Sequence, residues 1–255
     1  MTENRSYLVP GFHGVRETLR GSGIRLKALW IAEGKTSSRV RELVRAAEAQ
    51  GIPISMKPPG RLRALFPDVA HQGIVGVLDE FPYTSLSQLI ERCLPLKGQG
   101  LVMAADHITD GGNLGAMIRT AAYFGAHGLV IPKDRSARVD SKVMKRSSGG
   151  HMYVPIARVV NLARALDRLK EAGFWVIGAS GEASQSIFTF DWTRDVVLIA
   201  GNEQQGLSQA VRRRCHEVVS IPVPGEVASL NVSVACGIIL SEIYRQRKVA
   251  EVGRA

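Results

Sequence analysis

From residue 101 onward, short apolar runs alternate with stretches of helical periodicity, and this alternation constrains the fold more than any other feature of the sequence. The runs predicted as strands span residues 101–108, 128–132, 152–156, 174–180, 196–201 and 217–223. The predicted helices span residues 116–126, 139–150, 161–173 and 207–215, and a last helix starts at Asn231. Strands that are apolar along their whole length and alternate with helices are typical of a parallel sheet covered on both faces. The sequence therefore predicts an α/β domain over residues 99–250.

The first eighty residues show a shorter version of the same alternation. Apolar runs at 26–33, 52–57 and 71–81 are predicted strands, and residues 37–51 form a predicted amphipathic helix. The stretch that follows, residues 81–98, indicates a connector with one short helix. We therefore expect a small α/β domain over residues 1–80, a linker over 81–98, and then the larger domain.

The charge balance points to a polyanionic partner. The chain has 255 residues, of which 33 are Lys or Arg and 23 are Asp or Glu, so its formal net charge is +10. A basic excess of this size is typical of proteins that bind nucleic acid, although a solvated basic surface is an alternative. Both the first eighty residues and the remainder carry an excess of basic side chains, so both domains are candidates for this contact.

Cysteine usage and apolar segments indicate the compartment. Cys93, Cys215 and Cys236 are far apart and form no C-x-x-C pair, so neither a metal site nor a disulfide framework is expected. The first residues contain no apolar core of a secretory signal. The longest uncharged apolar stretch, 227–241, is shorter than the ~20 residues that a bilayer span needs. We therefore expect a cytoplasmic protein without a membrane partner.

Common nucleotide-binding and hydrolase motifs are absent from the sequence. Gly34, Lys35 and Thr36 resemble the end of a P-loop, but Leu29 stands where that motif requires a glycine. The run GGNLGA resembles a dinucleotide fingerprint, but Asn113 stands at its second glycine position. The chain also contains neither G-x-S-x-G nor H-E-x-x-H. These observations exclude the P-loop, nicotinamide, serine-hydrolase and zinc-protease classes.

Three polar or glycine-rich loops remain, each at the end of an apolar strand. They are DGGNLGAMIRTA at 110–121, AGNEQQGLS at 200–208 and IPVPGEVASLNVSVA at 221–235. In a parallel sheet the carboxyl ends of the strands meet at one edge, so the three loops can converge.

Arg119 and Glu203 are the charged candidates in these loops. Arg119 lies among Ile and Ala in a helix expected to be largely buried, where a cation must be paired or point into a cleft. A structural salt bridge to Glu203 is the alternative. Ser229 and Asn231 precede the last helix, where simple helix capping would explain both.

Taken together, the three loops resemble the conserved motifs of the SpoU family of RNA ribose 2'-O-methyltransferases, a branch of the SPOUT superfamily. The stretch NLGAMIRTAAYFGA is similar to the first motif, LIAGNEQQGLS to the second, and IPVPGEVASLNVSVACGIILSEIYRQR to the third. The N-terminal stretches VPGFHGVRETL and HQGIVGVL resemble the substrate-binding domain that precedes the catalytic domain in bacterial 23S ribosomal RNA guanosine-2'-O-methyltransferases. The resemblance covers nearly the whole chain.

The resemblance implies a fold, a reaction and partners. We expect a parallel-sheet SPOUT domain with a C-terminal trefoil knot, preceded by a small L30e-like α/β domain. The implied activity is transfer of a methyl group from S-adenosylmethionine to the ribose 2'-hydroxyl of a guanosine in 23S ribosomal RNA, by a homodimer. Transfer RNA is the alternative substrate within the same chemistry. A non-catalytic RNA-binding module for ribosome assembly is the alternative of a different class.

The resemblance also assigns residues. The implied catalytic residues are Asn113, Arg119, Glu203, Ser229 and Asn231. Gly201, Ile221 and Leu230 match the positions that hold the cofactor, and no metal is implied. A guanidinium is a poor proton acceptor at neutral pH. We therefore expect Arg119 to stabilise negative charge near the reacting oxygen, with the role of general base as the alternative.

Two further surfaces have a structural and a functional interpretation. The last helix carries an apolar stripe through Val232, Cys236, Ile239 and Ile243, and Val234 and Ile238 widen it. Such width suits a subunit interface, although burial within one chain is the alternative. The basic runs at 212–214 and 145–146 are candidates for phosphate contacts or for a solvated face.

Overall fold

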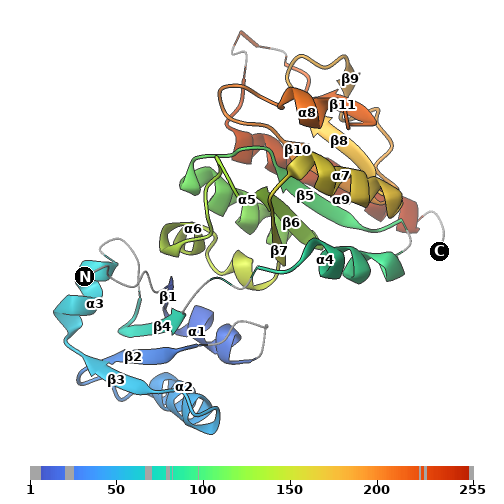
Figure 1. Cartoon of the computed structure of the whole chain (residues 1–255). Coiled ribbons are helices and arrows are strands. Elements are labelled where there is room, and N and C mark those ends of the chain that lie inside the picture. Colours follow the sequence, from blue (N-terminus) through green and yellow to red (C-terminus); the bar gives the residue numbers. More distant parts are fainter. Residues whose placement is uncertain are drawn as a thin grey trace. The chain divides into compact units, whose positions relative to one another are not determined.

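The chain divides into two compact units. The structure, a computed structural model, describes residues 7–20, 26–66, 71–78, 81, 83–96, 98–223, 225–226 and 229–252 (Figure 1). Unit 1 combines Met1–Pro82 with Val139–Tyr153, and unit 2 combines Tyr83–Arg138 with Val154–Ala255. Within the described residues, none of the helices combines the length and the apolar character that a membrane span requires.

Unit 1 is built on a four-stranded sheet in the order β1-β4-β2-β3. Its strands are β1 (Tyr7–Pro10), β2 (Ala28–Ala32), β3 (Ile54–Lys57) and β4 (Ile74–Leu78). Its helices are α1 (Phe12–Leu19), α2 (Ser38–Ala49), α3 (Pro59–Leu65) and α6 (Ser141–Arg146), with a short turn η2 (Gly150–Met152). β4 is antiparallel to both of its neighbours, whereas β2 and β3 are parallel. The predicted strands and the predicted helix are confirmed, except that residues 79 and 80 of the strand 71–81 lie outside the described residues.

Three elements of unit 1 were not predicted from the sequence. β1 has only four residues and ends in a proline, and α1 and α3 have eight and seven residues. Segments this short contain too few apolar positions to show the hydrophobic periodicity of a helix or a strand.

The segment 139–153 packs within unit 1 although it lies between two strands of unit 2. Its buried side chains are Val139, Val143, Met144, Ser147 and His151. Ser147 Oγ lies 2.8 Å from His151 Nδ1, and burial lowers the pKa of His151 to about 4. The prediction of a strand at 152–156 is wrong. Residues 150–152 form the turn η2, and the strand begins only at Ile156.

Unit 2 contains a seven-stranded sheet in the order β7-β6-β5-β10-β8-β11-β9, and every neighbouring pair is parallel. Its strands are β5 (Leu101–Ala105), β6 (Gly128–Pro132), β7 (Ile156–Val159), β8 (Trp175–Ala179), β9 (Gln185–Ser186), β10 (Val196–Ala200) and β11 (Glu217–Ser220). Its helices are α4 (Leu86–Cys93), α5 (Gly111–Tyr123), α7 (Leu162–Glu171), α8 (Gln209–Arg212) and α9 (Val232–Val252), with a short turn η1 (Leu94–Leu96). The predicted parallel α/β domain is confirmed.

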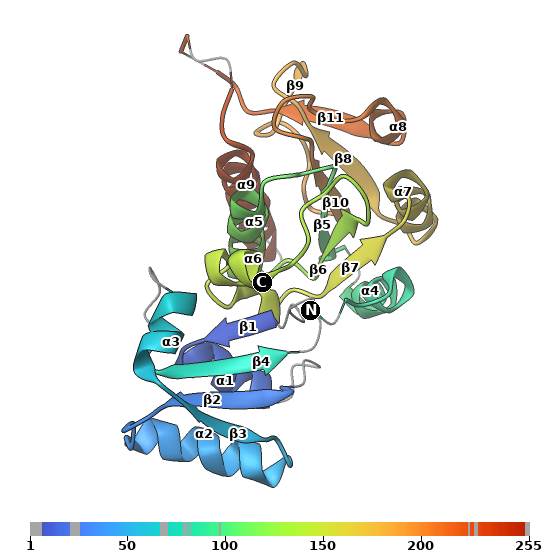
Figure 2. The ribbon, with the colours of Figure 1, turned by 60° about the vertical axis from the view of Figure 1, so that its left-hand side comes forward.

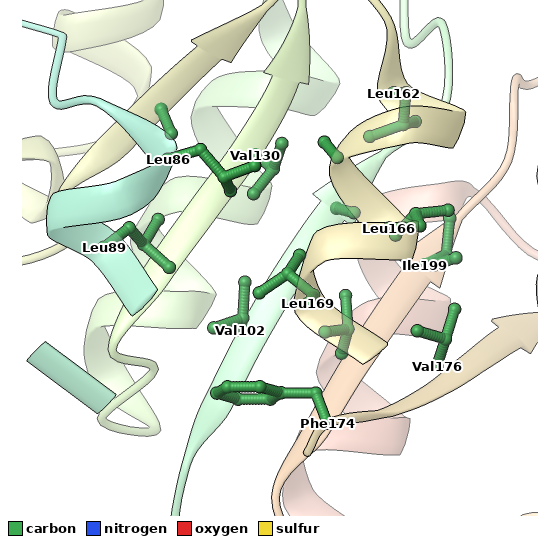
Figure 3. Close-up of a cluster of buried hydrophobic side chains, with 14 of the residues drawn as sticks. Leu86, Leu89, Val102, Val130, Leu162, Leu166, Leu169, Phe174, Val176 and Ile199 are labelled. Atoms are coloured by element: carbon green, nitrogen blue, oxygen red, sulfur yellow. The ribbon is translucent and has the colours of Figure 1, made fainter. Parts of the chain in front are cut away.

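Helices cover both faces of this sheet, as the apolar strands predict. Figure 2 shows α5 and α9 on one face, and α4, α7 and α8 on the other. Figure 3 shows the second face: Leu89 of α4 and Leu166 of α7 point toward Val102 and Val130 of the strands in one buried cluster. Because both faces are buried, the edge where the strands end is the natural place for a site.

α5 starts five residues earlier than the sequence predicts. Asp110 caps it, because the Asp110 side chain accepts a hydrogen bond from Asn113 N at 2.6 Å. Gly111 and Gly112, which indicate a turn by composition, form its first turn. α7 follows the prediction, with Asn161 as its N-cap and Gly173 at a φ of +94° after its end.

Arg247 of α9 binds the segments that lead into β5 and β10. Its buried guanidinium donates hydrogen bonds to the carbonyl oxygens of Gln99 (2.6 Å), Gly100 (3.1 Å), Trp192 (3.2 Å) and Arg194 (2.8 Å). Without it, the carbonyls of Gln99, Trp192 and Arg194 would lose this donor, and that of Gly100 would keep the bond from Val196 N at 2.9 Å. Polar groups that folding takes out of water without a partner are costly.

We expect Arg247→Met to destabilise the protein strongly, by about 3 kcal/mol or more. The thermal midpoint should then fall by roughly 6 to 12 °C, measured by circular dichroism. Lys248→Met is the control on the same helix, because the Lys248 side chain is 52% exposed and pairs with Glu251, which is 50% exposed. Equal effects of the two substitutions would contradict the interpretation.

Candidate active site

The three polar loops leave the carboxyl ends of β5, β10 and β11. β5 and β10 are direct neighbours, with Ala105 opposite Ala200 at their ends. β11 follows on the same side of β10, separated from it by β8. The sheet therefore brings the loops to one edge, as parallel strands predict.

A chain of side-chain hydrogen bonds joins the three loops. Asn113 Nδ2 donates to Glu203 Oε1 at 3.0 Å, and Asn231 Nδ2 donates to Asn113 Oδ1 at 2.9 Å. A carboxylate can only accept, so the amide of Asn113 has one possible orientation, with its oxygen toward Asn231. Residues 90 and 118 positions apart in the sequence are thus in direct contact.

Asn231 has a structural role as well as a place in this chain. It is the residue before α9, its carbonyl accepts from Ala235 N, and its side chain accepts from Ser233 N at 2.9 Å. The capping interpretation is therefore correct for Asn231. It is wrong for Ser229, because α9 begins at Val232 and Ser229 lies outside the cap position, exposed to solvent.

A buried carboxylate that the sequence analysis missed holds two of the loops together. Asp106 is 1% exposed, and its Oδ2 accepts from Ser208 N at 2.6 Å while its Oδ1 lies 2.7 Å from His107 Nδ1. Asn202 Nδ2 adds a bond of 2.7 Å to the carbonyl of His107. The sequence signal was available: Asp106 is a single acidic residue at the end of an otherwise apolar strand.

The loop 201–208 also folds tightly on itself. Asn202 and Gly206 exchange two backbone hydrogen bonds of 2.9 Å, and Asn202 Oδ1 accepts from Gln204 N and Gln205 N. A Cβ on Gly201 would lie 2.3 Å from the carbonyl carbon of Gly206. Gly201 is therefore required by close packing of the backbone, independently of any ligand.

Arg119 lies on the same helix as Asn113. It comes six residues after Asn113 on α5, which places it about 9 Å further along the helix axis and about a third of a turn around it. Its side chain is exposed, whereas Ile118 and Ala121 point into the core. The helix is largely buried, as expected, and Arg119 occupies its solvent face.

The cofactor candidates differ in exposure. Gly201 is buried, Ile221 is half-buried just after β11, and Leu230 is 50% exposed. Val223 is also exposed on the same segment. Leu230 directly precedes Asn231, and its exposed apolar side chain would suit a ligand that presents a flat apolar ring.

The thiols of the chain are poor nucleophiles. Burial raises the pKa of Cys93 and Cys215 to about 11 and that of Cys236 to about 12. They are protonated at neutral pH, so the site has to act through amides, a carboxylate and a guanidinium. Among the described residues, no three His, Cys, Asp or Glu side chains gather as metal ligands.

The basic run at 212–214 lies away from this edge. His216 N, just after the run, donates to the carbonyl of Val176 near the amino end of β8. Arg214 pairs with Asp167 of α7 at 2.9 Å, while Arg212 and Arg213 are exposed. The run at 145–146 belongs to unit 1, where Arg146 is exposed.

Comparison with known proteins identifies the family. The profile of the SpoU rRNA Methylase family matches residues 100–241, and that of the RNA 2'-O ribose methyltransferase substrate-binding domain matches residues 8–84. The 23S rRNA (guanosine-2'-O-)-methyltransferase RlmB of Pseudomonas aeruginosa is 37% identical over 95% of this chain and 98% of its own length. RlmB of Escherichia coli K12 is 35% identical over 95% and 99%.

A solved structure agrees with the sequence relatives. The SpoU methyltransferase AviRb from Streptomyces viridochromogenes, in complex with the cofactor AdoMet, superposes with a TM-score of 0.82. It is 29% identical, and the match covers 96% of this chain and 92% of AviRb. Sequence profile, relatives and fold agree over both units, and the chain belongs to the SpoU rRNA methylase family.

Proposed function

We propose that this protein transfers the methyl group of S-adenosylmethionine to the ribose 2'-hydroxyl of a guanosine in 23S ribosomal RNA. The observation that carries the proposal is the hydrogen-bond chain from Glu203 through Asn113 to Asn231, which joins all three motif loops at one edge. The RlmB relatives are named for this reaction and match nearly the full length. A ribosomal RNA substrate is also the reason to expect the protein in the cytoplasm.

The residues at the edge fit the proposed cofactor. Leu230 and Val223 expose apolar side chains that an adenine ring would cover, and the loop at Gly201 folds back closely on Gly206. When bound, S-adenosylmethionine supplies a methyl group on a sulfonium, which is an excellent leaving group. Gly201, Ile221 and Leu230 would hold it, while Asn113 and Glu203 fix the loops around it.

For methyl transfer, the protein must also align the ribose 2'-oxygen with the methyl group and help to remove the proton of the hydroxyl. Alignment of two reacting atoms lowers a barrier substantially without any further chemistry. Arg119 would stabilise negative charge on the 2'-oxygen or on the adjacent phosphate, since its guanidinium keeps its proton at neutral pH. Ser229 would orient the nucleotide. Its exposure before α9 leaves the hydroxyl accessible.

We also propose a homodimer that uses α5 and α9. Tyr123 of α5 is 83% exposed, and Val234 and Tyr244 of α9 are about half exposed. Phe124 lies between the two tyrosines, in ring contact with both. A second copy would cover this apolar surface and could bring Arg119 to a shared site. The trefoil knot stays a prediction of the resemblance.

The decisive experiment maps ribose methylation in ribosomal and transfer RNA from cells with and without the gene. Loss of one 2'-O-methylguanosine in 23S ribosomal RNA is the expected result. Loss from transfer RNA would favour the alternative substrate. An unchanged map, with purified protein that fails to bind S-adenosylmethionine, would favour a non-catalytic ribosome-assembly module.

We expect Arg119→Ala to lower kcat by roughly 100-fold or more, because it removes a charge that stabilises the transition state. The Kd for S-adenosylmethionine should change little. Tritium transfer to a 23S transcript and calorimetry measure the two quantities. Arg164→Ala, on the exposed side of α7, is the control. Full activity of Arg119→Ala would rule out the proposed role.

Asp106→Asn should weaken binding of S-adenosylmethionine, since a neutral amide holds the Ser208 N–H less strongly than a carboxylate does. We expect the KM for the cofactor to rise at least 5-fold while the KM for RNA stays unchanged. Asp195→Asn is a matched control: Asp195 also accepts from backbone amides, those of Gly98 and Gly100, but at the amino ends of the strands. If both variants shifted the cofactor KM equally, Asp106 would have only a general role in stability.

A further inference from the structure

The two halves of the site edge carry opposite charges. In the sheet, β6 and β7 lie on one side of β5, while β10, β8 and β11 lie on the other. Two of the motif loops leave the second half, and the first leaves β5 itself. An RNA strand with one ribose at the site would continue over the loops of one half or of the other.

The half built from β10, β8 and β11 is acidic. The loops after these strands, 201–208, 180–184 and 221–231, contain Glu203, Glu182 and Glu226 and no Lys or Arg. All three glutamates are exposed. The charged side chains that phosphates would meet on these loops are all negative.

The half built from β6 and β7 is basic. The loop 133–138, which follows β6, has the sequence KDRSAR, and Lys133, Arg135 and Arg138 are exposed. Asp134 is its one acidic residue. The loop thus offers three cations on the side of the site opposite the glutamates.

This basic loop is held in place next to the site. Lys133 N donates to the carbonyl of Val159 at 2.7 Å, and Arg158 Nη2 donates to the carbonyl of Lys133 at 2.9 Å. Ala137 N donates to the carbonyl of Ile108 at 2.8 Å. Ile108 is two residues before Asp110, the cap of α5, so the loop is anchored directly beside the helix start that carries Asn113.

From this charge pattern we infer that the target RNA strand runs over the β6–β7 half of the edge, where Lys133, Arg135 and Arg138 contact its phosphates. The inference rests on the proposed function and adds to it the path of the substrate. Phosphate contacts fix the register of a nucleic acid on a protein without reading its sequence. Here they would set which ribose reaches Asn113 and Arg119.

The test compares two double charge reversals of equal size in unit 2. Arg135→Glu with Arg138→Glu changes the basic loop, and Arg212→Glu with Arg213→Glu changes exposed arginines near the amino ends of the strands. Binding of a 23S transcript is measured by filter binding over a range of salt, and S-adenosylmethionine binding by calorimetry. Thermal melts confirm that both variants fold, and Arg135→Ala with Arg138→Ala replaces the first pair if it does not.

We expect the loop variant to raise the Kd for RNA at least 10-fold and to reduce the slope of log Kd against log salt by about 2, one for each lost phosphate contact. Its Kd for S-adenosylmethionine should stay unchanged. The Arg212 and Arg213 variant should change RNA binding less than about 3-fold. Equal losses in the two variants would show an effect of net charge alone, and a larger loss in the second would place the RNA at the other edge. Either result overturns the inference.

The test is independent of the proposed reaction. Wild-type protein that binds the transcript but transfers no methyl group to it would contradict the proposed function. The comparison of the two variants would still decide the path of the strand, because it measures affinity.

Discussion

The hydrogen bonds from Glu203 to Asn113 and from Asn113 to Asn231 are the interaction on which the site depends. A parallel sheet delivers strand ends to one edge but does not determine how the loops beyond them fold. Asn113 meets this need because a primary amide donates and accepts at once, so it can join a carboxylate on one side to a second amide on the other. The buried carboxylate of Asp106 contacts Ser208 and His107. It thereby holds in place the loop 201–208, which carries Glu203.

Helix caps lie within or directly beside the hydrogen-bond chain of the site. Asp110 caps α5 and Asn231 caps α9, and each stands next to, or belongs to, the chain of polar contacts at the edge. A cap must present a polar side chain at a helix start, and a site at a sheet edge needs polar side chains at the same place. Capping and ligand binding are therefore not competing explanations for Asn231. One side chain can donate to Asn113 through Nδ2 while its Oδ1 accepts from the helix.

The sequence predicted what depends on local periodicity. β6 has the predicted limits, and α7 has its predicted cap and terminal glycine, because apolar period and end residues are local properties. Two features depend on distant partners and were missed: the contact of Asp106 with Ser208, and the packing of residues 139–153 into unit 1. The apolar positions of that segment, such as Val143 and Met144, predict burial, but nothing local says against which sheet. The convergence of the motif loops was predictable because a parallel sheet requires it, whereas the Asn113 contacts that complete it were not.

The packing of 139–153 changes how the RNA-binding role of unit 1 can be studied. Removing residues 1–80 would strip the cover from Val143, Met144 and His151, which unit 1 buries although they lie between β6 and β7 of unit 2. An exposed apolar segment would favour aggregation. A loss of activity after such a deletion would therefore not show that unit 1 binds RNA. Substitution of exposed basic residues of unit 1, such as Arg41 and Arg45 on α2, leaves this packing intact and isolates the electrostatic contribution to binding. For this chain, then, the unit that resembles a separable substrate-binding domain in sequence is completed by a segment of the catalytic half.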